Sequence, residues 1–141
     1  MSKTYYFRNI DKHLLEWKKE NNHKPLLLRG ARQVGKSSAI RQLGKSFKYF
    51  VEVNFERDKE ITSLFKGNLK PKEIASRLSA FYGIPIIPNE TLLFFDEIQA
   101  CHEAIHSLWF FYEDYPELHV IAAGSLLEFA LKKMTSFGVG R

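Results

Sequence analysis

The sequence predicts an α/β fold in which a parallel sheet is flanked by helices, and three observations predict it. Four short stretches have the apolar, β-branched or aromatic composition of strands, and segments with helical patterns separate them. A glycine-containing loop joins the first of these strands to a helix. Residues 92–95 form an unbroken apolar run, typical of a strand buried in a parallel sheet. A chain of 141 residues, 45% of them hydrophobic, can bury one core, so we expect one domain over residues 1–141.

The N-terminal part of the chain predicts a helix over residues 9–20. Ile10, Leu14 and Trp17 recur at the spacing of one helical face, with charged residues opposite. Because this helix precedes the first strand, we expect it to pack on one end of the sheet. The aromatic residues 5–7 before it either stack on an adenine ring or belong to the core.

The first strand, residues 26–28, leads into the loop GARQVGKS, which fills every fixed position of the GxxxxGKS pattern. In a P-loop of this pattern, backbone N–H groups surround the phosphates of a nucleotide, the lysine reaches the terminal phosphates and the hydroxyl binds Mg²⁺. Glycine is required because a side chain would hold the backbone away from the phosphate. A loop that only turns the chain is the alternative. The predicted phosphate-binding residues are Gly30, Ala31, Arg32, Gln33, Val34, Gly35, Lys36, Ser37 and Ser38.

A helix and a second strand are expected after the loop. The helix covers residues 38–44, and we expect Arg41, Lys45 and Lys48 to share one of its faces. The strand covers residues 49–55, which are rich in β-branched and aromatic residues.

A charged stretch, residues 56–72, leads to another helix over residues 71–82. The proline at its start suits the first turn of a helix. We expect Ile74, Leu78 and Phe81 to line its buried face, because they share one side at helical spacing.

Two adjacent carboxylates, Asp96 and Glu97, follow the third strand. Ligands of a doubly wound sheet bind at the carboxyl ends of the strands, so Asp96 is expected to face the phosphates held by the loop. This arrangement is typical of a Walker B motif, in which Asp96 holds Mg²⁺ through water. Glu97 would orient or deprotonate the water that attacks the γ-phosphate. A chance acidic pair at a strand end is the alternative.

A competing motif, His102-Glu-Ala-Ile-His106, matches HExxH, whose histidines can ligate zinc while the glutamate acts as base. Zinc needs a third ligand, but tryptophan and tyrosine stand at the two further positions of the metzincin pattern, so Glu128 is the remaining candidate. We therefore keep zinc proteolysis as a remote alternative and expect residues 101–115 to form a helix against the sheet. The side chains expected to face the sheet are Ile105, Leu108, Trp109 and Tyr112.

The fourth strand, residues 119–123, ends in Gly124-Ser125. In a P-loop ATPase, a small polar residue at this strand end can contact the γ-phosphate or the attacking water, a position called sensor 1. Ser125 is the candidate for that position. It is equally suited to cap the helix expected over residues 126–132.

The net charge of +5 is distributed unevenly along the chain. Residues 1–72 carry 17 Lys and Arg against 7 acidic residues, whereas residues 73–141 carry 4 against 9. The basic half suits an anionic ligand and, as an alternative to plain solvated helix faces, nucleic acid. The single cysteine, Cys101, agrees with a reducing compartment, and the chain shows neither a signal peptide nor an apolar run of ~18 residues. We therefore expect a cytoplasmic protein without a membrane partner.

Four motifs, GARQVGKS, LLFFDEIQ, VIAAGS and the closing VGR, together resemble one family. They are similar to the AAA+-type ATPases of bacteria and archaea that join an N-terminal ATPase module to a C-terminal domain of unknown function. The resemblance implies a three-layer P-loop NTPase fold, and ATP hydrolysis that drives conformational change. By position it implies that Ser37 and Asp96 serve Mg²⁺, that Glu97 is catalytic and that Ser125 is the sensor. Arg141 falls where an arginine finger can act on the nucleotide of a neighbouring subunit, which implies a homo-oligomer.

Members of this family continue into a further core strand, a helical lid and the C-terminal domain. In such a sheet the further strand pairs beside residues 26–28, which would otherwise be an edge with unpaired N–H and C=O groups. We therefore expect residues 1–141 to be a C-terminally truncated ATPase core that lacks its last core strand and lid. We expect it to bind nucleotide, since its phosphate loop is whole, and to hydrolyse it weakly.

Two other classes of function stand beside ATP hydrolysis. A P-loop kinase shares the loop, but it does not explain Glu97, and the sequence shows no acceptor-binding motif. A nucleotide-dependent switch or nucleic-acid-binding module with incidental turnover is compatible with the basic N-terminal half. A GTPase is disfavoured because the chain lacks the NKxD tetrapeptide that reads guanine.

Overall fold

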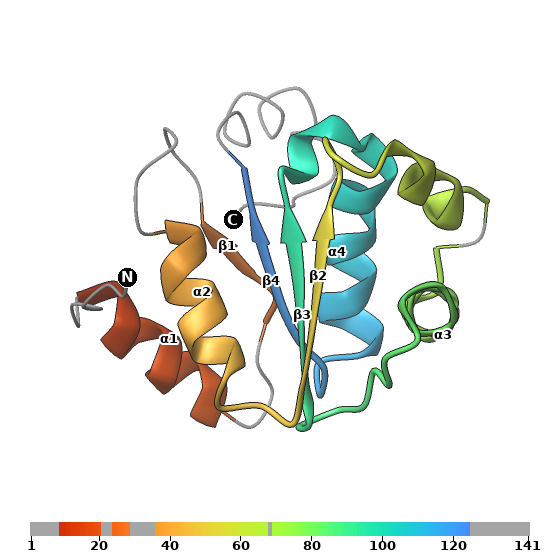
Figure 1. Cartoon of the computed structure of the whole chain (residues 1–141). Helices are drawn as coiled ribbons and strands as arrows, with labels where there is room; N and C mark the ends of the chain where they lie inside the picture. Colours follow the sequence, from red (N-terminus) through yellow and green to blue (C-terminus); the bar gives the residue numbers. More distant parts are fainter. Residues whose placement is uncertain (1–8, 21–23, 29–35, 68, 125–141) are drawn as a thin grey trace.

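The computed structural model of the chain describes residues 9–20, 24–28, 36–67 and 69–124. Within these ranges all four predicted strands are present, and the four predicted helices that fall there are present too. The helix predicted over residues 126–132 lies outside them. In chain order the elements are α1 (Asn9–Lys19), β1 (Leu26–Leu28), α2 (Lys36–Gly44), β2 (Tyr49–Asn54), the 3₁₀ helix η1 (Lys59–Phe65), α3 (Pro71–Tyr82), β3 (Thr91–Asp96), the 3₁₀ helix η2 (Ile98–Ala100), α4 (His102–Asp114) and β4 (His119–Ala123) (Figure 1).

The four strands form one parallel sheet in the order β1-β4-β3-β2. Its register aligns the carboxyl ends of all four strands. Leu28 pairs with Ala123, Ala123 with Asp96, and Asp96 with Asn54. These four residues therefore form one row across the sheet, and every connection that leaves the row starts at the same edge.

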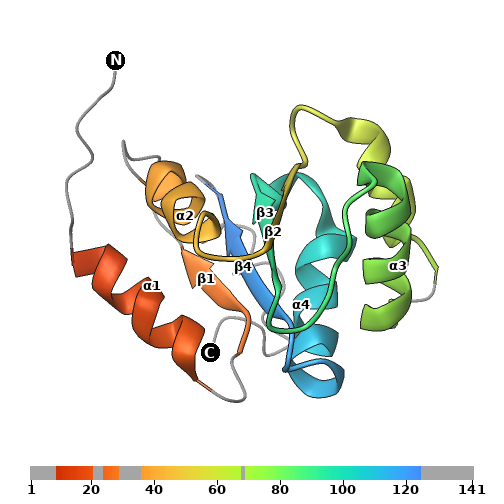
Figure 2. The same ribbon diagram turned by 60° about the horizontal axis from the view of Figure 1, so that its bottom comes forward.

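Helices cover both faces of the sheet, as Figures 1 and 2 show: α1 and α2 lie on one face, and α3 and α4 on the other. The side chains of β3 alternate between the two layers. Leu92 and Phe94 pack with residues of α1 and α2, whereas Leu93 and Phe95 pack with residues of α3 and α4. All six residues of β3 are buried, as expected for a strand with helices on both faces. The predicted three-layer α/β fold is confirmed.

The α1 helix packs on a face of the sheet beside α2, so the prediction that it packs on one end of the sheet is wrong. Its predicted apolar face is correct for Leu14 and Trp17, which are buried in the layer that α1 shares with α2. The imidazole of the buried residue His119 explains the position of the helix. Its Nε2 lies 2.9 Å from the carbonyl oxygen of Lys18, and its ring meets Trp17 edge to face.

The buried faces of α3 and α4 differ in part from the prediction. Ile74 and Leu78 are buried, but Phe81 is 49% exposed. In α4, Ile105 and Leu108 are buried as expected, whereas Tyr112 is exposed and Trp109 only half-buried. The buried stripe runs instead through Ala104, Ile105, Leu108 and Phe111. The helix is therefore rotated by about one position from the predicted orientation, because Phe111 fills the core in place of Tyr112.

The segments that flank β2 also differ from the prediction. Helix α2 ends at Gly44, so Lys45 and Lys48 lie beyond it and do not share a helical face with Arg41. The stretch after β2 contains η1, a helix that the charged composition did not predict. It is held in the core by Ile61 and Phe65, whose side chains are fully buried.

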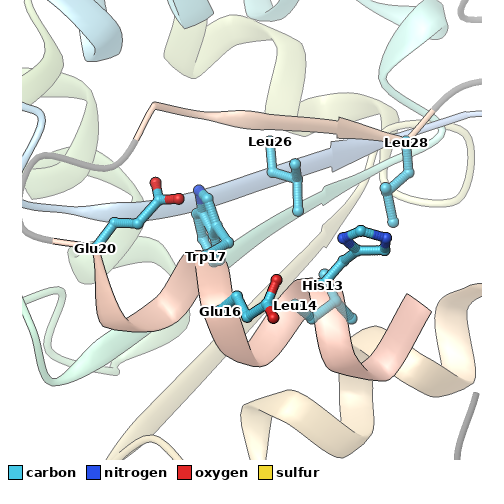
Figure 3. A pocket seen from close by; sticks show the side chains of 7 residues that line it. All are labelled: His13, Leu14, Glu16, Trp17, Glu20, Leu26 and Leu28. Carbon is cyan, nitrogen blue, oxygen red and sulfur yellow. The ribbon is translucent and has the colours of Figure 1, made fainter. Parts of the chain in front are cut away.

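Strand β1 lies at one edge of the sheet within the described part of the chain. A groove of about 500 Å³ runs between this strand and α1, with Leu26 and Leu28 on one wall and His13, Leu14, Glu16, Trp17 and Glu20 on the other (Figure 3). The expected further strand beside residues 26–28 stays a prediction. None of the helices in the described ranges is long and apolar enough to cross a membrane.

Candidate functional site

The candidate site lies at the carboxyl edge of the sheet. Leu28 is the last described residue before the GxxxxGKS loop, and α2 resumes the chain at Lys36. Two strand spacings of about 4.8 Å lie between Leu28 and Asp96 along the row, so their backbones are roughly 10 Å apart. The sheet thus brings the acidic pair to the edge at which β1 leads into the predicted phosphate loop.

The predicted phosphate-binding residues are only partly within the described ranges. Residues 29–35, which include Gly30, Ala31, Arg32, Gln33, Val34 and Gly35, lie outside them, as does the side chain of Lys36. Ser37 and Ser38 belong to the first turn of α2, where Ser37 is half-buried and Ser38 is exposed. That first turn contains no acidic residue, so the partial positive charge of the helix N-terminus is not neutralised by its own side chains.

Asp96 is the buried anion of the site, with only 8% of its surface exposed. Its Oδ1 accepts a hydrogen bond of 2.9 Å from the backbone N–H of Glu97. Burial raises the pKa of the Asp96 carboxyl, and the nearby negative charge of Glu97 raises it further. A buried carboxylate with this electrostatic cost is a suitable partner for a cation, and its hard oxygens match the ligands that Mg²⁺ prefers.

Arg41 supplies a positive charge close to Asp96 and lowers its pKa, against the effects of burial and Glu97. Its guanidinium donates two hydrogen bonds to Glu52, from Nε to Oε1 at 3.0 Å and from Nη2 to Oε2 at 2.8 Å. This pair joins α2, the helix after the loop, to β2. No sequence pattern predicted a partner for Arg41, because Arg41 and Glu52 meet only when α2 folds back over the sheet.

Glu97 directly follows β3 and has a left-handed backbone conformation, with φ of 52° and ψ of 45°. This conformation is unfavourable for a residue with a side chain, and such residues often occur at functional sites. The Glu97 carboxylate is half-buried, and its Oε1 accepts a hydrogen bond of 2.8 Å from the side-chain amide of Gln99. Gln99 belongs to the motif DEIQ, but its position in the sequence alone predicts no role for it.

The turn after β2 fixes the adjacent strand ends to one another. Asn54, which pairs with Asp96 in the row, accepts hydrogen bonds on its Oδ1 from the backbone N–H groups of Glu56 at 3.0 Å and Arg57 at 2.9 Å. The N–H of Phe55 then donates to the carbonyl oxygen of Asp96 at 3.1 Å. Asn54 was also missed, since a polar residue at the end of a predicted strand is by itself an ordinary turn signal.

The HExxH motif lies on α4. Its first histidine and its glutamate are exposed, and His106 is half-buried. Across the described ranges, no group of three or more His, Cys, Asp or Glu side chains is placed to hold a metal ion. Glu128, the predicted third zinc ligand, lies outside these ranges, and so do Ser125, Arg141 and the aromatic residues 5–7. Burial raises the pKa of the neighbouring Cys101 thiol to about 11, so it is protonated at neutral pH and is a poor metal ligand.

Comparisons with known proteins identify relatives of this chain. Residues 22–141 match a family described as AAA domain. Among solved structures, the chain is similar to the Walker-type ATPase PABY2304 of Pyrococcus abyssi, with a TM-score of 0.57 and 22% sequence identity. The similarity covers 91% of this chain and 48% of that one, so the chain spans about half the length of that ATPase. No curated protein matches the chain.

The likeness to the Pyrococcus protein shows the fold, a parallel α/β sheet of the P-loop ATPase type. The family match covers most of the chain and supports nucleotide binding of the ATPase type. The narrower resemblance, to proteins with a C-terminal domain of unknown function, stays a prediction. The chain belongs to the family of AAA domains.

Proposed function

We propose that this chain binds ATP with Mg²⁺ and hydrolyses it. The observation that carries the proposal is the row Leu28, Ala123, Asp96 and Asn54, which brings the Asp96-Glu97 pair to the edge where β1 enters the phosphate loop. A P-loop after one strand, with an acidic pair at the end of a nearby strand of the same sheet, is an arrangement typical of nucleoside-triphosphate hydrolysis. A P-loop kinase would also need an acceptor-binding motif, and the sequence shows none.

Each residue has a role that follows from its position. The loop from Gly30 to Gly35 would surround the phosphates with N–H groups, and Lys36 would reach the terminal ones. Ser37 and Asp96 would hold Mg²⁺, which when bound neutralises phosphate charge. Both side chains offer hard oxygen ligands, and the burial of Asp96 favours a bound cation over solvent.

Glu97 would act on the attacking water as an orienting group or base. Its carboxylate lies one residue beyond the proposed Mg²⁺ ligand and is held by the amide of Gln99. Ser125 follows β4 by two residues, which suits contact with the γ-phosphate or the water. An arginine finger from Arg141 of a neighbouring copy, and hence a homo-oligomer, belongs to the same proposal.

Ligand titration followed by thermal unfolding tests the binding step. A ligand present at 100 times its Kd stabilises the native state by about 2.7 kcal/mol. For a domain of this size that corresponds to a rise in Tm of about 8 °C, at about 3 °C per kcal/mol. We expect ATP with Mg²⁺ to produce such a rise in the natural chain and none in Lys36→Ala. Stabilisation by zinc alone that is lost in His102→Ala would instead favour the metalloprotease alternative.

A nucleotide-dependent switch is the second candidate, and the uneven charge of the chain is the observation that favours it. It predicts ATP binding with negligible turnover, and nucleic-acid binding by the basic N-terminal half that weakens steeply with salt. Both classes agree with weak hydrolysis and with a cytoplasmic location. Single-turnover hydrolysis and a salt titration with duplex DNA separate them.

A further inference from the structure

The side chain of Gln99 lies where three strands end. Its Nε2 donates to Oε1 of Glu97 at 2.8 Å and approaches Oε2 of Glu56, beyond β2, at 3.4 Å. Both neighbours are carboxylates, which only accept hydrogen bonds when ionised, so the NH₂ group must face them. The amide oxygen therefore points the other way. It is buried and has no hydrogen-bond partner among the described residues.

Gly124, the residue after β4, makes room for this amide. A Cβ at position 124 would overlap Oε1 of Gln99 and would lie 3.2 Å from its Cδ. Gly124 is not among the described glycines with positive φ, so its backbone does not require glycine. A larger residue at position 124 would instead displace the end of the Gln99 side chain. The Gln99 amide is thus fitted between Glu97 at the end of β3 and the backbone at the end of β4.

We propose that Gln99 is a positioning residue that holds the Glu97 carboxylate toward the attacking water, with Gly124 providing the space for its amide. The inference rests on the proposed ATP hydrolysis. Glu97 needs such a partner because the negative charge of Asp96 lies beside it and its own backbone is in a disfavoured conformation. A displacement of a catalytic group by about 1 Å can lower a rate by about 10²-fold.

The test uses single-turnover ATP hydrolysis with the 141-residue chain in excess. We expect Gln99→Met, which keeps the length of the side chain but removes the amide, to lower the rate about 10²-fold. The Kd for ATP with Mg²⁺ should stay within about twofold, because the phosphate loop is unchanged. Gln42→Met, the same substitution at an exposed position of α2, is the matched control and should leave both quantities unchanged.

Gly124→Ala tests the same mechanism from the other strand. We expect it to displace the amide and to lower the rate to a similar extent. The double variant with Gln99→Met should then be no slower than the slower single variant, because both changes remove one interaction. If the rate losses of the two single variants multiply in the double variant, Gly124 acts independently of Gln99, and this result would overturn the inference. A Gln99→Met variant that is as fast as the natural chain, or faster, while Glu97→Gln is inactive, would also overturn it and would leave the proposed ATPase intact.

A second measurement does not depend on turnover. The ¹H–¹⁵N resonances of the Gln99 side-chain amide, assigned by their loss in Gln99→Met, should move in both Glu97→Ala and Gly124→Ala. If the natural chain does not hydrolyse ATP, the proposed function fails, and this spectrum still decides whether the amide links the two strand ends. Resonances that move in neither variant would overturn the inference.

Discussion

Phe65 is expected to be a main support of the site, although it lies in η1, an element that the charged stretch did not predict. Its ring is fully buried and meets Phe55 and Phe95 edge to face, with centroids 5.4 and 5.6 Å away. Phe95 immediately precedes Asp96, and the backbone N–H of Phe55 donates a hydrogen bond to the carbonyl oxygen of Asp96. Removal of the Phe65 ring therefore leaves a cavity beside Phe55 and Phe95, the two side chains next to the backbone of Asp96.

Substitution Phe65→Ala should lower the free energy of unfolding by about 3 to 5 kcal/mol, the usual cost of truncating a buried phenylalanine. The loss of two edge-to-face contacts favours the upper part of this range. At about 3 °C per kcal/mol, the Tm should fall by about 9 to 15 °C. Phe81→Ala is the matched control. That ring is 49% exposed and meets only Tyr82 among the described ring contacts, so we expect a cost below about 1 kcal/mol.

Urea unfolding followed by the fluorescence of the two tryptophans measures both values. The buried environment of Trp17 makes its emission sensitive to unfolding. Equal slopes of the free energy of unfolding against urea concentration would show that both variants unfold from comparable native states. The reasoning is refuted if Phe65→Ala costs less than about 1 kcal/mol, or if Phe81→Ala costs as much as Phe65→Ala.

Three further substitutions have outcomes that follow from single contacts. Burial raises the pKa of the Asp96 carboxyl, so the folded chain binds this proton more tightly than the unfolded chain does. The stability that the protonated carboxyl contributes is therefore lost as the pH rises through the pKa of the folded state. Asp96→Asn should therefore be more stable than the natural chain to urea at neutral pH, with a difference that shrinks toward acid pH; a less stable variant contradicts this. His119→Ala should cost about 2 to 3 kcal/mol and speed amide hydrogen exchange in α1, because it removes the contact with Lys18; unchanged exchange contradicts it. In Gly44→Ala the new Cβ would lie 2.6 Å from Cδ1 of Phe50, so calorimetry should show a loss of about 1 to 3 kcal/mol rather than a gain in helix stability.

The strands and helices were largely predictable because each depends on local pattern. The apolar run before Asp96 predicted a buried strand, and the structure buries all six residues of β3. The orientation of helices was less predictable, because several faces of one helix are apolar. In α4, Phe111 and Tyr112 are adjacent aromatic residues, and only the shape of the opposing layer determines which of them is buried.

The position of the two carboxylates at the end of β3 was predictable, and the contacts of their neighbours were not. The strand end and the charges of Asp96 and Glu97 are both visible in the sequence. The contacts of Glu52 with Arg41, and of Gln99 with Glu97, depend on how the chain folds over the sheet and on side-chain direction. The requirement for glycine at position 124 arises from a neighbour 25 residues earlier, so no local pattern reveals it.

The most direct measurement of the central proposal compares Glu97→Gln with Glu103→Gln, each assayed for ATP binding by calorimetry and for single-turnover hydrolysis. Glu103 is the exposed glutamate of the HExxH motif, so its substitution is chemically identical and lies outside the proposed site. We predict that Glu97→Gln binds ATP with Mg²⁺ like the natural chain but loses hydrolysis by about 10²-fold or more, while Glu103→Gln retains both. Unchanged hydrolysis in Glu97→Gln, or loss of hydrolysis only in Glu103→Gln, would contradict the assignment of the acidic pair.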